Sequence, residues 1–402
     1  MFTKPANEIE FQDVKNFCDE FGEGIRVEYK QEIKDIPKIV SSFANTLGGA
    51  FIIGAETDKK TNKVIAIDGI PNSGGLEEQI HQSALTGIYP AVMPEVIILD
   101  HPTNLNHVVI IIRVDESPQA PHAIQNSTRV YIRVESITQP YKLELAEIDR
   151  IEYMLKRRAD SQIVTQQILN RIEERTEALF NTKEPNLTVI ARPVFPYRPV
   201  ISTEDIYNFA MESTLFGTHL AKVAGGVAEG FPPRTLTRAD HDSYTYLELN
   251  EYGIIYNRSA LIRESSRIPV DGNNGTYLIF AEFVWKIGAL INQRRFFYEK
   301  CGYSGNIEVT AQLRQIFGEK IKYGDESRYQ IEEQRSADSE VSASTQYLPR
   351  DLVKREKFIE VIDELAGQLL WAFNVHVSDP QNRRDMVEYI LIRNSLLKSR
   401  PK

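Results

Sequence analysis

Residues 35–56 read DIPKIVSSFANTLGGAFIIGAE, and this stretch joins a helix signal to a strand signal. Its first part carries one apolar stripe at helical spacing, formed by Ile36, Ile39, Val40, Phe43, Ala44 and Leu47. Asp35 is the expected N-cap, Pro37 lies in the first turn, and Gly48 supplies a left-handed stop. The apolar run at 50–56 then predicts a buried strand. The stretch therefore predicts a helix followed at once by a core strand.

The segments on either side of this stretch extend the same pattern. Residues 8–20 have helical spacing, and residues 25–30 alternate as a strand does, with Arg26, Glu28 and Lys30 on the polar face. Residues 62–70 are expected to pair antiparallel with 50–56 across a turn at 58–61. Further along, the sequence predicts a helix at 75–85 and strands at 93–99, 106–114 and 128–136.

A helical pattern from 144 to about 180 separates this region from the rest of the chain. It is compatible with one long helix or with two shorter ones, and a helix of that length is a candidate oligomer or interdomain element. We expect an α/β (α+β) fold in three parts: a mixed sheet with helices at 1–158, a helical connector at 159–184, and a second α+β domain at 185–402.

The second domain shows strand and helix signals in turn. Strands are expected at 187–195 and 306–316, a hairpin around Gly253, an apolar helix at 277–300, and closing helices at 352–373 and 380–398. A capping box predicts a helix start at 202–210, and the Ser/Ala-rich end of 326–346 predicts an exposed loop.

Composition limits the classes of function. The net charge is −9, which counts against a protein that coats nucleic acid non-specifically and leaves room for a local basic groove. No apolar run approaches the roughly 18 residues of a membrane span, and the N-terminus does not resemble a signal peptide. The two cysteines, Cys18 and Cys301, fit a reducing compartment. We therefore expect a cytoplasmic protein without a membrane partner.

Several common catalytic motifs are missing from the sequence. It contains no Walker A loop, no GxGxxG after a strand, no HExxH and no GxSxG. His101 and His107 are close in sequence but do not form a metal motif, and Asp240, His241 and Asp242 are expected in a solvated loop. The remaining chemistry-bearing residues lie in the first domain.

Three separated motifs of that domain carry a resemblance. They are GEGIRVEYK at 22–30, SSFANTLGGAFIIGAE at 41–56 and VYIRVESIT at 130–138. In this order and spacing they resemble the Schlafen-type AlbA_2 domain, over roughly residues 10–155. Two positions depart from the family pattern, because Gly24 stands where the family has Ser and Glu135 where it has Gly. The second half of the chain shows no comparable resemblance.

The resemblance implies nucleic-acid binding and, as in some Schlafen proteins, metal-dependent RNA cleavage by three acids. Carried onto this chain, the acids are Glu23, Glu28 and an acid after Gly54. Asp58 is preferred as the third, with Glu56 as the alternative. Such a trio would hold Mg²⁺ or Mn²⁺, which activates water and neutralises charge on a scissile phosphate.

The same resemblance implies the residues that contact nucleic acid. They are Arg26, Lys30, Asn45 and Arg133. Each has a structural alternative: Asn45 lies at a helix end, and Arg133 is as well suited to a cross-strand ion pair as to a phosphate contact. Glu28 is placed to pair with Lys30 or Arg26.

Strand geometry sets a condition on the acid pair. Residues five apart on a regular strand point to opposite faces and lie roughly 16 Å apart. Glu23 and Glu28 can share a site only if the chain turns at Gly22 and Gly24, where glycine permits a sharp bend.

Two functions follow as hypotheses. The first is a Schlafen-like nucleic-acid-binding protein, acting as a metal-dependent endonuclease on tRNA-like RNA or single-stranded DNA in stress response or phage defence. The second is a non-catalytic DNA- or RNA-binding or assembly module, in which the 144–180 helix or the C-terminal domain makes oligomer or partner contacts. Nucleotide binding at the Gly48–Gly49 turn is a third, weaker idea.

Overall fold

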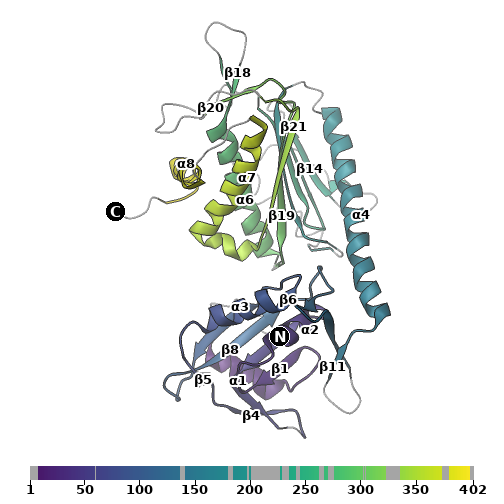
Figure 1. The fold of residues 1–402 in the computed structure, drawn as a ribbon, viewed down its shortest axis with the longest axis vertical. Helices are drawn as coiled ribbons and strands as arrows, with labels where there is room; N and C mark the ends of the chain where they lie inside the picture. Colours follow the sequence, from purple (N-terminus) through teal and green to yellow (C-terminus); the bar gives the residue numbers. More distant parts are fainter. Residues whose placement is uncertain are drawn as a thin grey trace. The chain divides into compact units, whose positions relative to one another are not determined.

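The computed structural model describes residues 8–58, 60–135, 141–179, 184–196, 199–200, 227–228, 235–240, 245–261, 267–269, 276–301, 303, 305–322, 336–373 and 380–398. The chain divides into two compact units, Met1–Asp160 and Ser161–Lys402 (Figure 1). Both combine helices with sheets, which confirms the expected α+β class. Within the described ranges, no helix is long and apolar enough to cross a membrane.

The first unit alternates short helices with strands. Its elements are α1 (Phe11–Glu20), β1 (Val27–Lys30), α2 (Ile36–Ala44), β2 (Gly49–Ile53), β3 (Ala55–Thr57), β4 (Val64–Ile67), β5 (Ile70–Pro71), α3 (Leu76–Gly87), β6 (Ile88–Tyr89), β7 (Glu95–Asp100), β8 (His107–Val114), β9 (Ala123–Ile124), β10 (Arg129–Val134) and β11 (Lys142–Leu145). The last helix of the unit is the first part of α4 (Ile148–Leu179).

The main sheet of this unit is buried on both faces. β1 pairs parallel with β2, β2 pairs antiparallel with β8, and both β5 and β7 pair with β8. Phe51 and Ile53 pack with α2 and α3 on one face, whereas Ile52 packs with α1 on the other. Because side chains alternate across a strand, the continuous apolar run of β2 supplies two cores at once. A second, smaller sheet contains β11, β10, β9 and β6 in that order.

Helix α2 forms as the apolar stripe predicts, and the stripe residues within it are buried, but the helix ends at Ala44, and Leu47, the last expected member of the stripe, is exposed. Gly48 adopts φ +67°, and a Cβ there would lie 2.7 Å from the carbonyl oxygen of Val114, so this position requires glycine. Asp35 occupies the expected N-cap position of α2. Its φ of 55° differs from the extended backbone of a usual N-cap, and its side chain makes no capping hydrogen bond.

The pairing expected between residues 62–70 and 50–56 is corrected in part. β4 pairs with β3, whereas β2 pairs with β1 and β8. The reason is Gly54, whose φ of +96° ends β2 and redirects the chain before β3 begins. A Cβ on Gly54 would lie 2.7 Å from the Cα of Gly69, so the close approach of these two turns also requires glycine.

The second unit contains the rest of α4 and a larger sheet. Its further strands are β12 (Asn186–Pro193), β13 (Val227–Ala228), β14 (Thr235–Asp240), β15 (Thr245–Asn250), β16 (Ile255–Ala260), β17 (Arg267–Pro269), β18 (Thr276–Ile279), β19 (Ile307–Arg314), β20 (Lys320–Lys322) and β21 (Glu340–Tyr347). Its further helices are α6 (Phe280–Lys300), α7 (Arg355–Leu370) and α8 (Pro380–Arg393), with short 3₁₀ helices at Pro349–Val353 and Trp371–Phe373.

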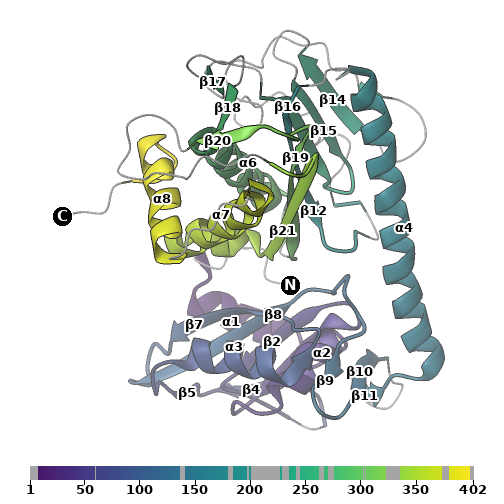
Figure 2. The same ribbon diagram turned by 45° about the horizontal axis from the view of Figure 1, so that its top comes forward.

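Seven of these strands, as far as the chain is described, form one antiparallel sheet in the order β13-β14-β15-β16-β12-β19-β21. Both views show α6 and α7 on one side of this sheet and α4 on the other (Figures 1 and 2). The α6–α7 side is a large apolar core. On the α4 side a small apolar cluster around Ile168 and Ile172 is joined by ion pairs, such as that of Arg175 with the buried Glu248.

Three sequence expectations in this region have clear outcomes. The 144–180 pattern contains one helix, α4, rather than two, but the helix begins at Ile148 because β11 extends to Leu145. The hairpin around Gly253 is confirmed by the pairing of β15 with β16. The exposed loop expected at 326–346 is wrong for its last part, because β21 begins at Glu340; one side of this strand packs on the core although its sequence is rich in serine. The helix start at 202–210 and residues His241 and Asp242 lie outside the described residues.

Candidate functional site

The chain turns between Gly24 and Val27, just ahead of the first strand. The N–H of Gly24 donates to the Val27 carbonyl at 3.0 Å, and the N–H of Val27 donates back at 3.3 Å. β1 therefore begins at Val27 instead of residue 25, and Glu23 lies before the turn. Gly22 is also required, because a Cβ there would lie 2.6 Å from the carbonyl oxygen of Asn62. The bend that the acid pair needs is present.

Glu28 points into a buried polar cluster rather than to solvent. The residue is 3% exposed, so of the polar face expected for this strand Glu28 is covered, whereas Arg26 is exposed and Lys30 half-buried. One carboxylate oxygen accepts from Arg133 Nη1 at 2.9 Å and from the Tyr141 hydroxyl, and the other pairs with Lys30. Both oxygens are therefore engaged by side chains of this domain.

Arg133 links the second sheet to the turn. Its Nε donates to the Ile25 carbonyl and its Nη2 to the Gly24 carbonyl, both at 2.9 Å. Its guanidinium lies 4.1 Å from the ring centre of Phe43 and 3.7 Å from that of Tyr141. With the side chain fully buried, Arg133 is an ion-pair partner of Glu28 and a clamp on the turn.

The two acids of the turn have opposite pKa shifts. Burial raises the pKa of Glu23 above its ordinary value, and the nearby Glu28 carboxylate raises it further. Burial opposes the charge on Glu28 too, but Arg133 and Lys30 outweigh it and hold the pKa of Glu28 below its ordinary value. Lys30 and Arg133 therefore act on both neighbouring acids, but only for Glu28 do they outweigh the effect of burial on the pKa.

The third expected acid has a local role. The Asp58 carboxylate accepts the backbone N–H of Lys60 at 2.6 Å and of Thr61 at 3.3 Å, which is an Asx turn that closes the β3–β4 hairpin. Glu56, the alternative, lies on β3 opposite Ala66.

These acids do not form a metal site of the usual kind. A divalent ion needs several carboxylate oxygens that converge on one point. Among the residues that the structure describes, no group of three or more His, Cys, Asp or Glu side chains is placed to hold a metal ion. The donor set therefore does not fit the expected trio of Glu23, Glu28 and Asp58, and Mg²⁺ or Mn²⁺ binding stays a prediction.

The four residues expected to contact nucleic acid differ in their exposure to solvent. Arg26 is exposed and Lys30 is half-buried, whereas Arg133 and Asn45 are buried. The Asn45 amide donates to the carbonyls of His122 and Tyr131 and accepts the His122 N–H, so it joins the end of α2 to two other segments. Its role in this structure is to hold the fold together.

A row of cationic and aromatic side chains follows one face of β10. Lys38 Nζ lies 4.9 Å from the ring centre of Tyr131, and Tyr131 shares its face with Arg133, which stacks on Tyr141. Lys30 continues the row through Glu28. The accessible members, Lys30, Lys38, Tyr131 and Tyr141, are half-buried and are called the lysine–tyrosine row below.

Sequence reasoning missed three members of this row. The alternation of VYIRV could have placed Tyr131 beside Arg133. Lys38 and Tyr141 have no local signal, because they join the row only through contacts between distant segments.

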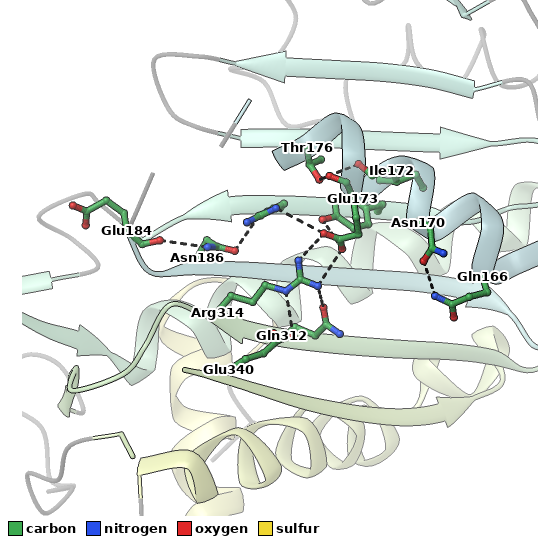
Figure 3. A network of polar contacts seen from close by, with 12 residues as sticks. Gln166, Asn170, Ile172, Glu173, Thr176, Glu184, Asn186, Gln312, Arg314 and Glu340 are labelled. Carbon is green, nitrogen blue, oxygen red and sulfur yellow. Dashed lines mark hydrogen bonds and ion pairs between the residues drawn. The ribbon is translucent and has the colours of Figure 1, made fainter. Parts of the chain in front are cut away.

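The second unit contains a polar pocket of about 460 Å³, lined by Glu173, Glu177, Arg258, Arg314, Gln315, Ser339 and Glu340. Figure 3 shows Glu173 of α4 facing Arg314 of β19, and the Arg314 guanidinium donates to it at 2.6 and 3.2 Å. Arg314 also donates to Gln312 and Glu340. These bonds hold α4 against the sheet.

Comparison with known proteins bears on the first unit. Residues 8–142 match the family described as Schlafen, AlbA_2. The solution structure of the N-terminal domain of a RecG-related protein from Nitrosomonas europaea is similar over 30% of this chain and 82% of that chain, with 16% identity and a TM-score of 0.26. No curated protein matches the sequence. The family match confirms the resemblance carried by the three motifs, and the N-terminal part of this chain, residues 8–142, is a Schlafen AlbA_2 domain.

Proposed function

We propose that the AlbA_2 domain binds single-stranded nucleic acid, RNA or DNA, as a non-catalytic module, and that the lysine–tyrosine row makes the contact. The observation that carries this proposal is the row itself, in which two lysines and two tyrosines are half-exposed along adjacent elements. Single strands are bound by this combination, because bases stack on aromatic rings while cations follow the phosphates.

The charge of the whole chain is compatible with such a local site. A net charge of −9 disfavours broad contact with phosphates, so binding has to rely on a few placed cations and on stacking. Arg26 is exposed in the turn next to the row and adds a cation near it. The fully buried Arg133 supports the proposal indirectly, because it fixes Tyr141 and the turn.

The non-catalytic form of the proposal follows from the acids. Both oxygens of Glu28 are held by side chains, and Asp58 closes a turn. Metal-dependent cleavage of RNA or single-stranded DNA is the competing function, and the proximity of Glu23 to Glu28 is the observation in its favour.

Two single charge-reversal variants, one within the lysine–tyrosine row and one outside it, test the binding site. Lys38→Glu should lower the affinity for a labelled single-stranded oligonucleotide roughly tenfold and reduce the salt slope by about 1, because one phosphate contact is lost. The matched control is Lys15→Glu on α1, an exposed lysine on the helix that packs against the opposite face of the main sheet. Fluorescence anisotropy with RNA and DNA of the same sequence measures both.

Equal losses in the two variants, or no binding at low salt, would refute the row as the contact surface. Cleavage is tested in parallel by incubating tRNA and single-stranded DNA with Mg²⁺ or Mn²⁺. Cleavage by the wild type but not by Glu28→Gln, together with a metal-induced rise in wild-type melting temperature, would replace the binding module with the nuclease.

The assembly role belongs to the same proposal and has its own test. Homo-oligomer formation through α4 or the second unit stays a prediction from the long helix. Light scattering over a range of protein concentrations measures it, and a constant monomer mass would exclude it.

A further inference from the structure

Strand β21 lies at the end of the large sheet and pairs with β19 on its inner side. The direction of its peptide groups is fixed by one residue. The N–H of Ser344 donates to Gln368 Oε1 of α7 at 3.2 Å, so it points away from β19. Because peptide groups alternate in direction along an antiparallel strand, those of Ser342 and Gln346 also point outward. We refer to Ser342, Ser344 and Gln346 as the outer edge of β21.

The side chain of Gln368 forms with this edge the hydrogen bonds that the backbone of a neighbouring strand would form. Its side-chain amide accepts from the Ser344 N–H and donates to the Ser344 carbonyl at 3.4 Å. A carboxamide carries the same donor and acceptor as a backbone peptide group, so one side chain takes the place of one residue of a paired strand. Among the described residues, the outward peptide groups of Ser342 and Gln346 make no such bond.

The edge has few of the usual protections against pairing. Exposed edge strands are ordinarily guarded by lysine, proline, a bulge or a very short length. β21 is eight residues long, pairs with β19 in unbroken register and carries one charged residue, Glu340. The side chains of Ser342, Ser344 and Gln346 are exposed. The two hydrogen bonds between the Gln368 side chain and Ser344 are therefore the main obstacle to the pairing of a further strand with β21.

The charge beside the edge decides between possible occupants. Glu364 of α7 is exposed next to the edge and accepts from the Thr345 hydroxyl at 2.6 Å. A second copy of β21 paired about a two-fold axis would bring a second α7, with its own Glu364, alongside the first. Like charges placed in this way oppose association, whereas lysine or arginine on an incoming strand is attracted.

We propose that the outer edge of β21 binds an extended, lysine- or arginine-bearing peptide segment of another protein by strand addition, and that Gln368 is displaced when it binds. Backbone hydrogen bonds to Ser342, Ser344 and Gln346 supply the affinity, and Glu364 supplies the preference for a basic segment. The proposal concerns the second unit alone and does not depend on nucleic-acid binding by the first.

A labelled peptide of sequence Lys-Thr-Val-Lys-Val-Thr-Lys is the probe, titrated against the full chain by fluorescence anisotropy. Gln368→Ala should bind it about tenfold more tightly than the wild type, because two hydrogen bonds to Ser344 no longer compete. Ser344→Pro should abolish binding, since it removes the outward N–H and leaves the ladder with β19 intact. Replacing the lysines of the probe with glutamates should weaken binding severalfold, as the charge of Glu364 requires.

A second measurement does not depend on the fold of a variant. Amide hydrogen exchange of the wild type with saturating peptide should slow at Ser342 and Gln346. Unchanged exchange at these amides, no gain in affinity with Gln368→Ala, or equal binding by a well-folded Ser344→Pro would each overturn the proposal. Concentration-dependent dimerisation that Ser344→Pro abolishes would assign the edge to a second copy instead.

Discussion

Arg133 carries its guanidinium into the interior of the first unit, where a charge is costly unless an acid and hydrogen bonds surround it. Glu28, two carbonyls of the turn and two aromatic rings meet this need. From the sequence, a phosphate contact and an ion pair were equally good predictions for the role of Arg133. The sequence does not identify the ion-pair partner, because Glu28 lies 105 residues away along the chain and local patterns do not report such contacts.

His122 gives the first unit a pH-dependent stability. Burial lowers its pKa to about 4, and Nε2 has no hydrogen-bond partner among the described residues, while Nδ1 bonds the Pro90 carbonyl at 2.7 Å. The unfolded chain takes up a proton below its pKa of about 6.5 and the folded chain does not, so stability falls as the pH drops from about 6.5 to about 4. The loss should reach roughly 3 kcal/mol in the free energy of unfolding.

Urea unfolding at several pH values, followed by circular dichroism, measures this loss. His122→Asn keeps a donor for the Pro90 carbonyl but cannot titrate, so its stability should depend less on pH across that window. Carboxylates contribute equally to both proteins, and the difference between the two slopes therefore isolates His122. Parallel slopes would contradict the prediction.

At the scale of elements, predictability follows how local the determining contact is. Helix α2, the hairpin at Gly253 and the alternation of β19 were predicted, because each is specified by spacing within a few residues. β21 was missed because serine and alanine do not indicate a strand. Its burial on one side comes from α7 and from its neighbour β19. The turn before β1 was recognised only as a condition, which the backbone hydrogen bonds between Gly24 and Val27 then met.

The junction of α2 and β2 depends on Gly48. Gly48 and Gly74 have similar backbone angles, φ +67° and +72°, but an added Cβ meets Val114 at Gly48 and nothing within 4 Å at Gly74. Gly74→Ala should therefore cost about 1 kcal/mol in unfolding free energy, from left-handed strain alone. Gly48→Ala should cost about 3 kcal/mol, because the clash with backbone is added to the strain. Chemical denaturation of both variants gives the comparison, and similar losses would show that the close packing at Gly48 relaxes.

At the scale of the whole molecule, the cores are separate although α4 is continuous. Each hydrophobic cluster of the described residues draws its members from one unit, with Met154 the last member in the first unit and Val164 the first in the second. Cooperative unfolding follows shared cores, so two units without a common core are expected to unfold as two.

Differential scanning calorimetry should therefore show two transitions that respond to different substitutions. Gly48→Ala should lower one melting temperature by several degrees and leave the other unchanged. Glu248→Gln should lower the other, because it weakens a fully buried partner of Arg175 and Tyr246 in the second unit. A single transition that both substitutions lower would mean that the α4 helix transmits unfolding across the boundary at Asp160. In that case the binding of nucleic acid to the first unit would also stabilise the second, and a ligand-induced shift of the Glu248→Gln transition would reveal it.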